Sequence, residues 1–270
     1  MGNKMRYKKR LARKLWWRGH KGKMGTLFLG AAALLGLIWF GVFSHKTGDD
    51  TTSWASSIPE GNGFSLGLCV SRPDLIPDYS GEDYVILNDG MPCFNLYDLA
   101  NREGETYSEL DELGRCGGAV AMLDRSMMPS EERGSIGDIK PTGWMQKKYP
   151  GIVDSEPPYL YNRCHLIAYA LTGQNANERN LITGTRYMNA QSMLAWEKKV
   201  MKYLDHSENH VLYRVTPFFQ GRELVARGVE IEAYSLEDQG TGLCFHVFVY
   251  NIQPGIEIDY LTGESRAINE

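Results

Sequence analysis

The apolar residues are distributed along the chain in three different ways. Residues 24–43 (MGTLFLGAAALLGLIWFGVF) form an uncharged apolar run. A helix of that length, rising about 1.5 Å per residue, spans a hydrocarbon core of roughly 30 Å, so this run predicts one transmembrane helix. Residues 44–61 are polar and lack apolar periodicity, which is typical of a flexible linker. From residue 62 to residue 270 short apolar segments alternate with turns, which predicts one folded domain.

Within residues 62–270 most apolar segments have the length and composition of β-strands. Residues 84–87 and 91–95 flank Asn88-Asp89-Gly90, whose residues tolerate or favour positive φ, so we expect a hairpin there. Residues 119–123 are a short apolar strand candidate, and apolar residues alternate with others in residues 210–215, 229–234 and 243–250. Short loops that contain Gly connect these segments, which predicts an antiparallel sheet.

Residues 185–204 (TRYMNAQSMLAWEKKVMKYL) are the clearest helix. An apolar stripe runs along one side of the helical wheel, and three lysines face the opposite side. Asn189 and Glu197 fall about 40° to either side of Met193, inside the apolar stripe. The pattern therefore predicts that an amide and a carboxylate point inward. Together with the strands, this helix predicts an α+β fold, an antiparallel sheet with packed helices.

Positive charge is concentrated at the amino end. Residues 1–24 hold ten Lys and Arg and no acid, which leaves 29 − 10 = 19 basic against 33 acidic residues in the rest, a formal charge of −14. Basic residues beside a membrane-spanning segment stay in the cytoplasm. We therefore expect a cytoplasmic tail (1–23), an anchor in the cell membrane (24–43) and an extracellular domain (62–270). The alternative is a cleaved signal peptide and a secreted domain, but its apolar region would be shorter, about 7 to 15 residues.

The acidic balance of residues 25–270 restricts the partners of the domain. A negatively charged domain gains nothing from its overall charge when it approaches a phosphate polymer. Binding of nucleic acid would therefore require a local basic cleft or a metal ion.

Five cysteines, Cys69, Cys93, Cys116, Cys164 and Cys244, belong to the predicted extracellular part, where disulfides can form. Their odd number leaves at least one thiol unpaired in a monomer, and their spacing matches no zinc motif. Two interpretations stay open. Either Cys69, Cys93, Cys116 and Cys244 form two disulfides, in any connectivity, or all five are reduced, buried thiols.

The residues that carry chemistry gather before and within the predicted helix. Residues 159–167 (YLYNRCHLI) are strand-like, and Arg163 and His165, two positions apart, share one face of a strand. The amide-rich loop 172–180 follows and ends at Asn180. Strand, loop and helix together predict a ββα arrangement that holds a metal ion.

Hydrolysis of a phosphodiester needs a base for water, a cation for the charge that develops on phosphate, and a donor that holds the phosphate. His165 suits the base, because an ordinary imidazole has a pKa near about 6.5. Magnesium keeps most of its water shell, so Asn189 as a direct ligand and Glu197 bonded to coordinated waters match its preference. Arg163 would bind a phosphate oxygen.

Each of these residues also has a purely structural interpretation. His165 could be a satisfied core histidine. Asn189 could be the helix N-cap, but a cation there would face the positive end of the helix dipole, so the metal interpretation requires the helix to begin before Asn189. Three further basic residues are candidates for a phosphate-binding cleft, with ordinary solvated charges as the alternative: Arg133, Lys140 and Arg186.

The motif Asn162-Arg163-Cys164-His165 resembles the Asp-Arg-Gly-His motif of the DNA/RNA non-specific endonuclease family, the ββα-metal nucleases. Asn189 stands 24 residues after His165, where secreted and membrane-anchored Gram-positive members of that family keep their magnesium-binding Asn. Asn180, nine residues before Asn189, and Glu197, eight after it, also match family positions. The resemblance extends over residues 84–260.

The resemblance implies a magnesium-dependent enzyme, with manganese as the other metal, that cuts DNA and RNA without sequence preference and leaves a 5′-phosphate. His165 would activate water, Asn189 would bind the ion, and Glu197 and Asn180 would support the hydrated ion. Asn162 in place of Asp and Cys164 in place of Gly depart from the motif and put substrate affinity and rate in doubt. The alternative function is a non-catalytic module that captures DNA at the membrane.

Overall fold

The computed structural model describes residues 76–94 and 104–268. The predicted tail (1–23), anchor (24–43) and linker (44–61) lie outside these residues and stay predictions. Within the described ranges, no helix has both the length and the apolar character that crossing a bilayer requires.

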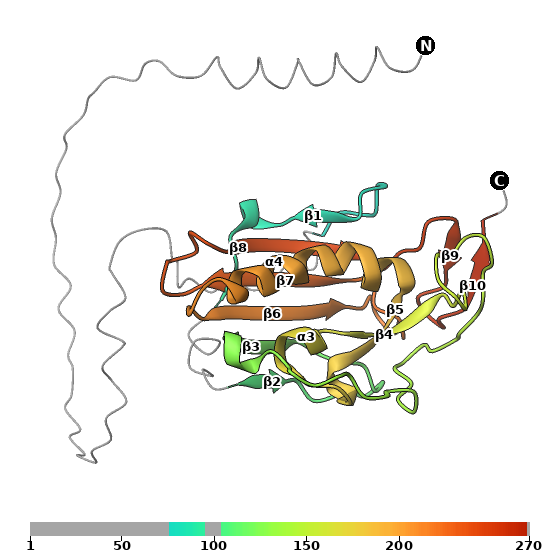
Figure 1. The fold of residues 1–270 in the computed structure, drawn as a ribbon. Helices are drawn as coiled ribbons and strands as arrows, with labels where there is room; N and C mark the ends of the chain where they lie inside the picture. Colours follow the sequence, from blue (N-terminus) through green and yellow to red (C-terminus); the bar gives the residue numbers. More distant parts are fainter. Residues whose placement is uncertain (1–75, 95–103, 269–270) are drawn as a thin grey trace, which may run out of the picture. The chain divides into compact units, whose positions relative to one another are not determined.

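An antiparallel sheet of six strands forms the centre of the described part (Figure 1). Its strands follow the order β1-β8-β7-β6-β3-β2. Their bounds are β1 (Tyr84–Ile86), β2 (Glu105–Tyr107), β3 (Ala119–Leu123), β6 (Val211–Phe218), β7 (Gly228–Ser235) and β8 (Cys244–Tyr250). The strands predicted at 119–123, 210–215, 229–234 and 243–250 are therefore confirmed as β3, β6, β7 and β8.

Two small antiparallel pairs and several helical segments complete the fold. One pair is β4 (Tyr161–His165) with β5 (Leu181–Thr185), and the other is β9 (Ile256–Ile258) with β10 (Ser265–Ala267). The helical segments are η3 (Asn88–Gly90), η4 (Arg125–Met127), α3 (Tyr169–Thr172), η5 (Glu178–Asn180), η6 (Met188–Ser192) and α4 (Met193–Asp205). An antiparallel sheet with packed helices matches the predicted α+β class.

Helix α4 crosses one face of the sheet (Figure 1) and encloses the main core with it. Its apolar stripe is buried as the periodicity predicts, and the ring of Trp196 packs 4.8 Å from Phe245 of β8 and 5.0 Å from Tyr84 of β1. A large apolar side chain that is fully buried contributes about 1.5 to 3 kcal/mol to stability. This packing therefore fixes α4, and with it Asn189 and Glu197, against the sheet.

The predicted helix 185–204 is confirmed, with one difference in its first turns. The backbone is helical from Arg186 to Asp205, but η6 is π-helical. A π-helical turn inserts one residue into the usual helical repeat and is found frequently at functional sites. Asn189 lies inside this turn.

The predicted hairpin around Asn88-Asp89-Gly90 is wrong, although the turn itself forms. These three residues have φ values of 45°, 52° and 83°, as the turn chemistry requires. Residues 91–94, however, form no strand, and β1 pairs with β8, with Tyr84 opposite Val249. Pairing with a long buried strand outweighs the local preference for a hairpin.

The face of the sheet opposite α4 carries a buried group of charged residues. Arg214, Glu230, Glu232 and His246 form this back-face cluster under residues 91–94. Arg214 and Glu232 approach to 2.5 Å, and they bind the backbone of Cys93 through its carbonyl (2.7 Å) and its N–H (2.5 Å). The buried charges thus fasten the segment that leads out of η3.

Both interpretations of the cysteines are wrong. Cys93 forms a disulfide, whereas Cys116, Cys164 and Cys244 are free, and Cys69 lies outside the described residues. Two disulfides among the four proposed cysteines are excluded because two of those four are free thiols. Five reduced thiols are excluded because Cys93 is oxidised.

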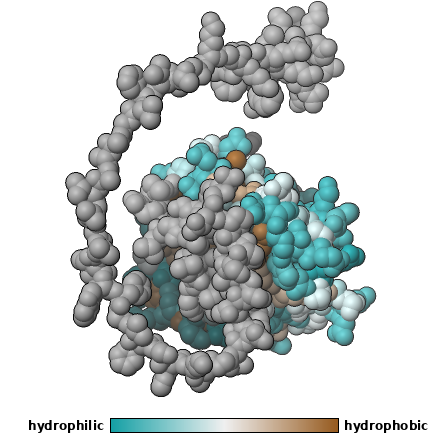
Figure 2. Space-filling view, turned by 90° about the vertical axis from the view of Figure 1, so that its left-hand side faces the viewer, coloured by the Kyte–Doolittle hydropathy of each residue, from teal (hydrophilic) through white to brown (hydrophobic). Residues whose placement is uncertain are grey.

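Figure 2 shows one side of the described part of the chain, on which the coloured surface is mostly hydrophilic and hydrophobic colour is confined to small areas.

Candidate active site

Strands β4 and β5 and the helix that follows them form a ββα unit. Gly184 in β5 makes its close packing feasible, because a Cβ there would lie 2.6 Å from the Cβ of Cys164 and 2.8 Å from Cε of Met188. The Cys164 sulfur is buried and lies 3.7 Å from Sδ of Met193, in the first turn of α4. The side chain that replaces the motif Gly therefore points into the core and does not narrow the approach of a substrate.

His165, the last residue of β4, is held in one tautomer. Its Nε2 lies 2.8 Å from the backbone carbonyl oxygen of Asn175. A carbonyl can only accept a hydrogen bond, so Nε2 carries the proton and Nδ1 keeps its lone pair. Nδ1 faces a guanidinium nitrogen of Arg133 at 3.2 Å, and a guanidinium can only donate, which agrees with this assignment. The basic nitrogen is thus turned toward a cation.

The surroundings of His165 keep the ring neutral. The side chain is 5% exposed, and burial lowers its pKa from 6.5 to about 4. The Asn175 carbonyl opposes this shift, and the positive charge of Arg133 adds to it. At neutral pH the imidazole is therefore unprotonated and able to accept a proton, as a general base must be.

Asn175 organises this site through two of its groups. Its backbone carbonyl orients His165, and its side-chain oxygen accepts a hydrogen bond from Nε of Arg133 at 3.3 Å. The sequence marks Asn175 only as one amide in an amide-rich loop. Arg133 lies beside the predicted base. Lys140 and Arg186 form no ion pair with another residue in the described ranges. Contact of all three residues with substrate stays a prediction.

Arg163 shares the face of β4 with His165, as the alternation predicts, but its guanidinium is already engaged. Nε donates to the carbonyl of Ile139, Nη2 donates to that of Gly137 at 2.5 Å, and the group stacks 4.4 Å over the ring of Trp144. These contacts hold the segment that follows Arg133. Binding of phosphate by Arg163 stays a prediction that would use its remaining N–H groups.

Asn180 is fully buried and binds the chain just beyond β4. Its side-chain oxygen accepts from the N–H of Ile167 at 2.9 Å, and its amide nitrogen donates to the carbonyl of Ile167 at 3.0 Å. These bonds keep the end of β4 in place beside η5. The predicted support of a hydrated ion by Asn180 has no contact in the described structure that favours it.

Asn189 can act as a metal ligand only if the helix begins before it, and the structure meets this condition. The helix begins before it, since Tyr187 already has helical φ and ψ of −64° and −52°, so Asn189 is not the N-cap. Its side chain is half-buried and makes no hydrogen bond with any residue in the described ranges. The carboxamide oxygen is therefore available as a ligand.

Glu197 is a buried carboxyl group on the same helix, and no ion pair with another described residue offsets its charge. It is 8% exposed, and burial raises its pKa from 4.5 to about 7. A cation nearby would lower the cost of burying this charge. An amide oxygen and an unpaired carboxylate on one helix fit a hard divalent ion such as Mg²⁺. No described hydrogen bond links His165 to Asn189, so their convergence on one ion stays a prediction.

A second group of donor atoms does not fit a metal. Cys93, Glu232 and His246 place one ligand atom each within 4.8 Å of the others. Cys93 is oxidised in a disulfide, however, and the other two are bound within the back-face cluster.

Comparison with known proteins identifies a family model and a related protein that match this chain. A model of the DNA/RNA non-specific endonuclease family matches residues 95–236, just over half of the chain. A deoxyribonuclease from Streptococcus dysgalactiae subsp. equisimilis is 33% identical over 110 residues, which are 39% of this chain and 32% of the relative. The chain thus matches about a third of the length of that curated protein.

Solved structures of related proteins share the fold. The magnesium-bound structure of NucA from Streptococcus agalactiae is 29% identical, with a TM-score of 0.58, over 68% of this chain and 87% of NucA. The Sda1 nuclease with a bound zinc ion is 23% identical, with a TM-score of 0.56, over 70% of this chain and 96% of Sda1, a likeness of fold. From the matched family model and the ββα unit built around His165, we conclude that the chain belongs to the DNA/RNA non-specific endonuclease family.

Proposed function

We propose that this protein is a metal-dependent endonuclease that hydrolyses phosphodiester bonds of DNA and RNA without sequence preference. The observation that carries the proposal is the environment of His165. Its proton is fixed on Nε2 by the carbonyl of Asn175, and Nδ1 keeps a lone pair beside the Arg133 guanidinium. Membership of the family supports the reaction class.

The residues around His165 suggest how the reaction proceeds. Nδ1 accepts a proton from the water that attacks phosphorus, and the strand holds the ring in place while the proton moves. Arg133 binds a non-bridging phosphate oxygen, because a guanidinium prefers a phosphate to a neutral imidazole. Once phosphate binds Arg133, Nδ1 becomes free to meet the water. The bond from phosphorus to the 3′-oxygen breaks, and that oxygen takes a proton from solvent, so cleavage leaves a 5′-phosphate and a 3′-hydroxyl, as the family resemblance implies.

The metal would be Mg²⁺, with Mn²⁺ as a substitute. Asn189 would supply a direct oxygen ligand, and Glu197 would bind the waters of the hydrated ion. When bound, the ion supplies positive charge for the negative charge that grows on the phosphate. The magnesium ion in the related NucA structure supports this choice.

The protein acts outside the cytoplasm, anchored in the cell membrane through residues 24–43. The length of that apolar run and the basic residues before it support this location. The disulfide at Cys93 supports it as well, because disulfides persist in oxidising compartments. Added protease should remove residues 62–270 from intact cells, and protection of the domain until the cells are lysed would refute the location.

The test of the function uses the full-length protein in detergent with supercoiled plasmid DNA and, separately, with RNA. With Mg²⁺ we expect nicked and then linear plasmid, together with degraded RNA, and with EDTA we expect neither. Retarded but intact plasmid would instead identify a DNA-capture module. Cleavage that persists in EDTA would refute the metal.

A further inference from the structure

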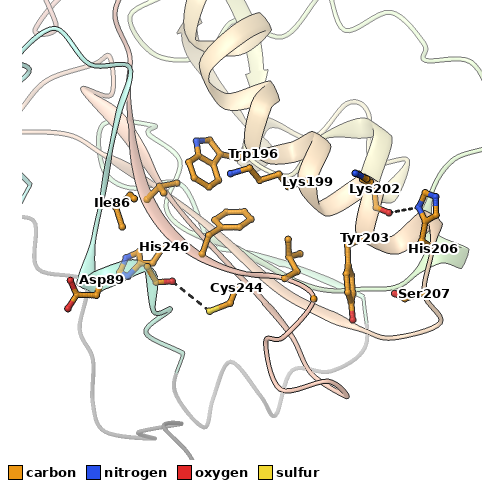
Figure 3. Close-up of a pocket in the computed structure, with 15 residues that line it drawn as sticks. Ile86, Asp89, Trp196, Lys199, Lys202, Tyr203, His206, Ser207, Cys244 and His246 are labelled. Atoms are coloured by element: carbon orange, nitrogen blue, oxygen red, sulfur yellow. Dashed lines mark hydrogen bonds between the residues drawn. The ribbon is translucent and has the colours of Figure 1, made fainter. Parts of the chain in front are cut away.

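A groove of about 690 Å³ lies on the flank of α4, between this helix, β8 and the turn from β1 into η3 (Figure 3). We call it the α4–β8 groove. It contains none of the residues placed in the candidate active site. Pockets of roughly 300 to 1,000 Å³ are the size that binds small ligands or segments of a polymer. The groove is therefore large enough for one nucleotide of a strand and its neighbours.

The helix side of the groove is cationic. Lys199 and Lys202 line it, and neither forms an ion pair with an acidic residue in the described ranges. The ammonium group of Lys199 lies 3.4 Å from the ring centroid of Trp196, and burial lowers the pKa of this lysine. His206 adds an imidazole whose Nδ1 donates to the carbonyl of Lys202 at 2.8 Å, so its Nε2 points elsewhere. A negatively charged ligand would relieve the unpaired positive charge.

The floor of the groove is apolar. Trp196, Leu243 and Phe245 are 6%, 7% and 6% exposed and line it, and Ile86 at the edge is 62% exposed. Figure 3 shows Trp196, Lys199 and Tyr203 of α4 directed toward the side chains of β8. The hydroxyl of Ser207, another lining residue, is buried without a hydrogen-bond partner in the described ranges. A ligand that combines negative charge with an apolar part would complement the two sides of the groove.

A strand of nucleic acid has these properties. Proteins bind single strands with basic side chains for phosphates and an apolar or aromatic surface for bases. Lys199 and Lys202 lie ten and thirteen residues after Asn189 on one continuous helix, which is about 15 to 20 Å along its axis. At about 3.4 Å per nucleotide of a strand, that distance corresponds to about four to six nucleotides. In a domain that is acidic overall, an additional basic contact would keep a long substrate bound.

We propose that the α4–β8 groove binds a single-stranded segment of the nucleic acid substrate, with Lys199 and Lys202 on its phosphates and a base over Leu243 and Phe245. The proposal rests on the proposed function, because it assigns a second contact to the same substrate. It predicts that long strands bind more tightly than short ones and that the difference depends on these two lysines.

Cys244 lies at the edge of the groove, with its sulfur 3.7 Å from the carbonyl oxygen of Gly90, so a strand bound there would restrict access to its thiol. It lines the groove and is partly exposed, whereas the other free thiols described, Cys116 and Cys164, are buried. The experiment measures maleimide labelling of Cys244 in full-length His165→Ala protein, by peptide mass spectrometry, in EDTA. A 20-nucleotide oligothymidylate should slow labelling several-fold, and a 4-nucleotide one should have little effect. An unchanged labelling rate with the long oligonucleotide would overturn the proposal.

A charge variant and its matched control sharpen the result. In Lys199→Gln/Lys202→Gln the protection should disappear. The dissociation constant of the long oligonucleotide should rise about tenfold at low salt, and the salt slope should fall by about 1.4, or 0.7 per phosphate contact. Lys147→Gln/Lys148→Gln removes two adjacent exposed lysines elsewhere and should leave the protection and the dissociation constant nearly unchanged. Equal effects of the two variants would overturn the assignment to the groove.

Two further outcomes separate the possible failures. If the wild type cuts plasmid but Cys244 is not protected, the groove proposal fails and the proposed function stands. If Cys244 is protected but the wild type does not cut, the function fails and strand binding at the groove stands. Protection by phosphatidylglycerol vesicles, and not by oligonucleotide, would overturn the proposal in favour of a membrane-facing surface.

Discussion

Two buried polar regions of the described structure lie on opposite faces of one sheet and differ in how their charges are partnered. In the back-face cluster two cations and two carboxylates satisfy one another, and His246 is bound at Nε2 by Glu230 (2.5 Å) and at Nδ1 by the carbonyl of Met91 (3.0 Å). On the α4 face, Glu197 is buried without a counter-ion among the described residues. His165 there presents a basic nitrogen to Arg133.

The contrast shows that structural and functional polar groups differ less in burial than in whether neighbouring side chains balance their charge. Burial lowers the pKa of His246, but the hydrogen bond to Glu230 and the charges of Glu232 and Glu230 outweigh it, so the net shift is upward. Acceptors at both ring nitrogens also favour the charged form. At His165 the carbonyl of Asn175 only partly opposes the effect of burial, so the net shift of the pKa is downward and that ring is neutral. A buried charge that its neighbours balance holds the fold, and an unbalanced one is suited to meet an ion or a substrate.

Among the predicted changes, replacement of Asn189 at the candidate active site should have the largest effect, a loss of cleavage rate. Asn189→Ala removes the proposed metal ligand, and we expect cleavage of plasmid to slow about a thousandfold, equivalent to about 4 kcal/mol. Calorimetric titration should show weaker Mg²⁺ binding. Gln191→Ala, an exposed change in the same helical segment, is the control. Similar losses in both variants would mean that the segment, and not the amide, matters.

Replacement of Glu232 should lower the stability of the fold and leave the rate of cleavage unchanged. Glu232→Ala removes the buried carboxylate that Arg214 binds, and we expect a loss of about 3 kcal/mol in the free energy of unfolding by urea. The rate per folded molecule should stay unchanged. Glu237→Ala, which removes the exposed partner of His210, should cost almost nothing. A Glu232 variant that stays stable but inactive would reverse the roles given to the two regions.

The unbalanced charge of Glu197 should appear in the pH dependence of stability without metal. Its pKa is raised from 4.5 to about 7, so the folded protein binds this proton more tightly than the unfolded chain. The resulting stability is fully present below about pH 4.5 and is lost as pH rises through about 7. Between pH 5 and 8 in EDTA the wild type should lose about 2 kcal/mol more than Glu197→Gln. Parallel unfolding curves would show that Glu197 is already balanced.

The smallest predicted change in stability comes from removing the hydroxyl of Tyr213, which lies near Glu197. Tyr213 is fully buried, and its hydroxyl has no hydrogen-bond partner in the described ranges. Tyr213→Phe should therefore raise stability by about 1 kcal/mol. Tyr161→Phe is the matched control, because that buried hydroxyl donates to the carbonyl of Gly263 at 2.8 Å and its loss should destabilise by about 1 kcal/mol. Equal destabilisation by both changes would reveal an unseen partner for Tyr213.

Features with a local period could be predicted from the sequence. The inward direction of Glu197 follows from the helical period, and the central strands follow from alternating apolar residues. Strand β5 was missed, because residues 181–185 continue into the helix without a turn that would mark their end. The hairpin at residues 84–95 was wrong because the choice of β8 as a partner depends on packing far away in the chain.

Roles that act through the backbone left no signal in the sequence. Asn175 orients His165 with a carbonyl that any residue possesses, so its identity does not predict that role. The spacing could place Arg163 beside His165, but could not show that the carbonyls of Gly137 and Ile139 bind its guanidinium. The approach of Arg133, 32 residues before His165, depends on how the loop folds back over β4.

The central claim is that Nδ1 of His165 takes the proton of the attacking water. The most direct measurement is the rate at which His165→Ala nicks supercoiled plasmid in Mg²⁺, with cooperative urea unfolding measured on the same sample. We predict a rate at least about a hundredfold below wild type in a protein that still unfolds cooperatively. A folded His165→Ala protein that nicks plasmid at the wild-type rate would contradict the account.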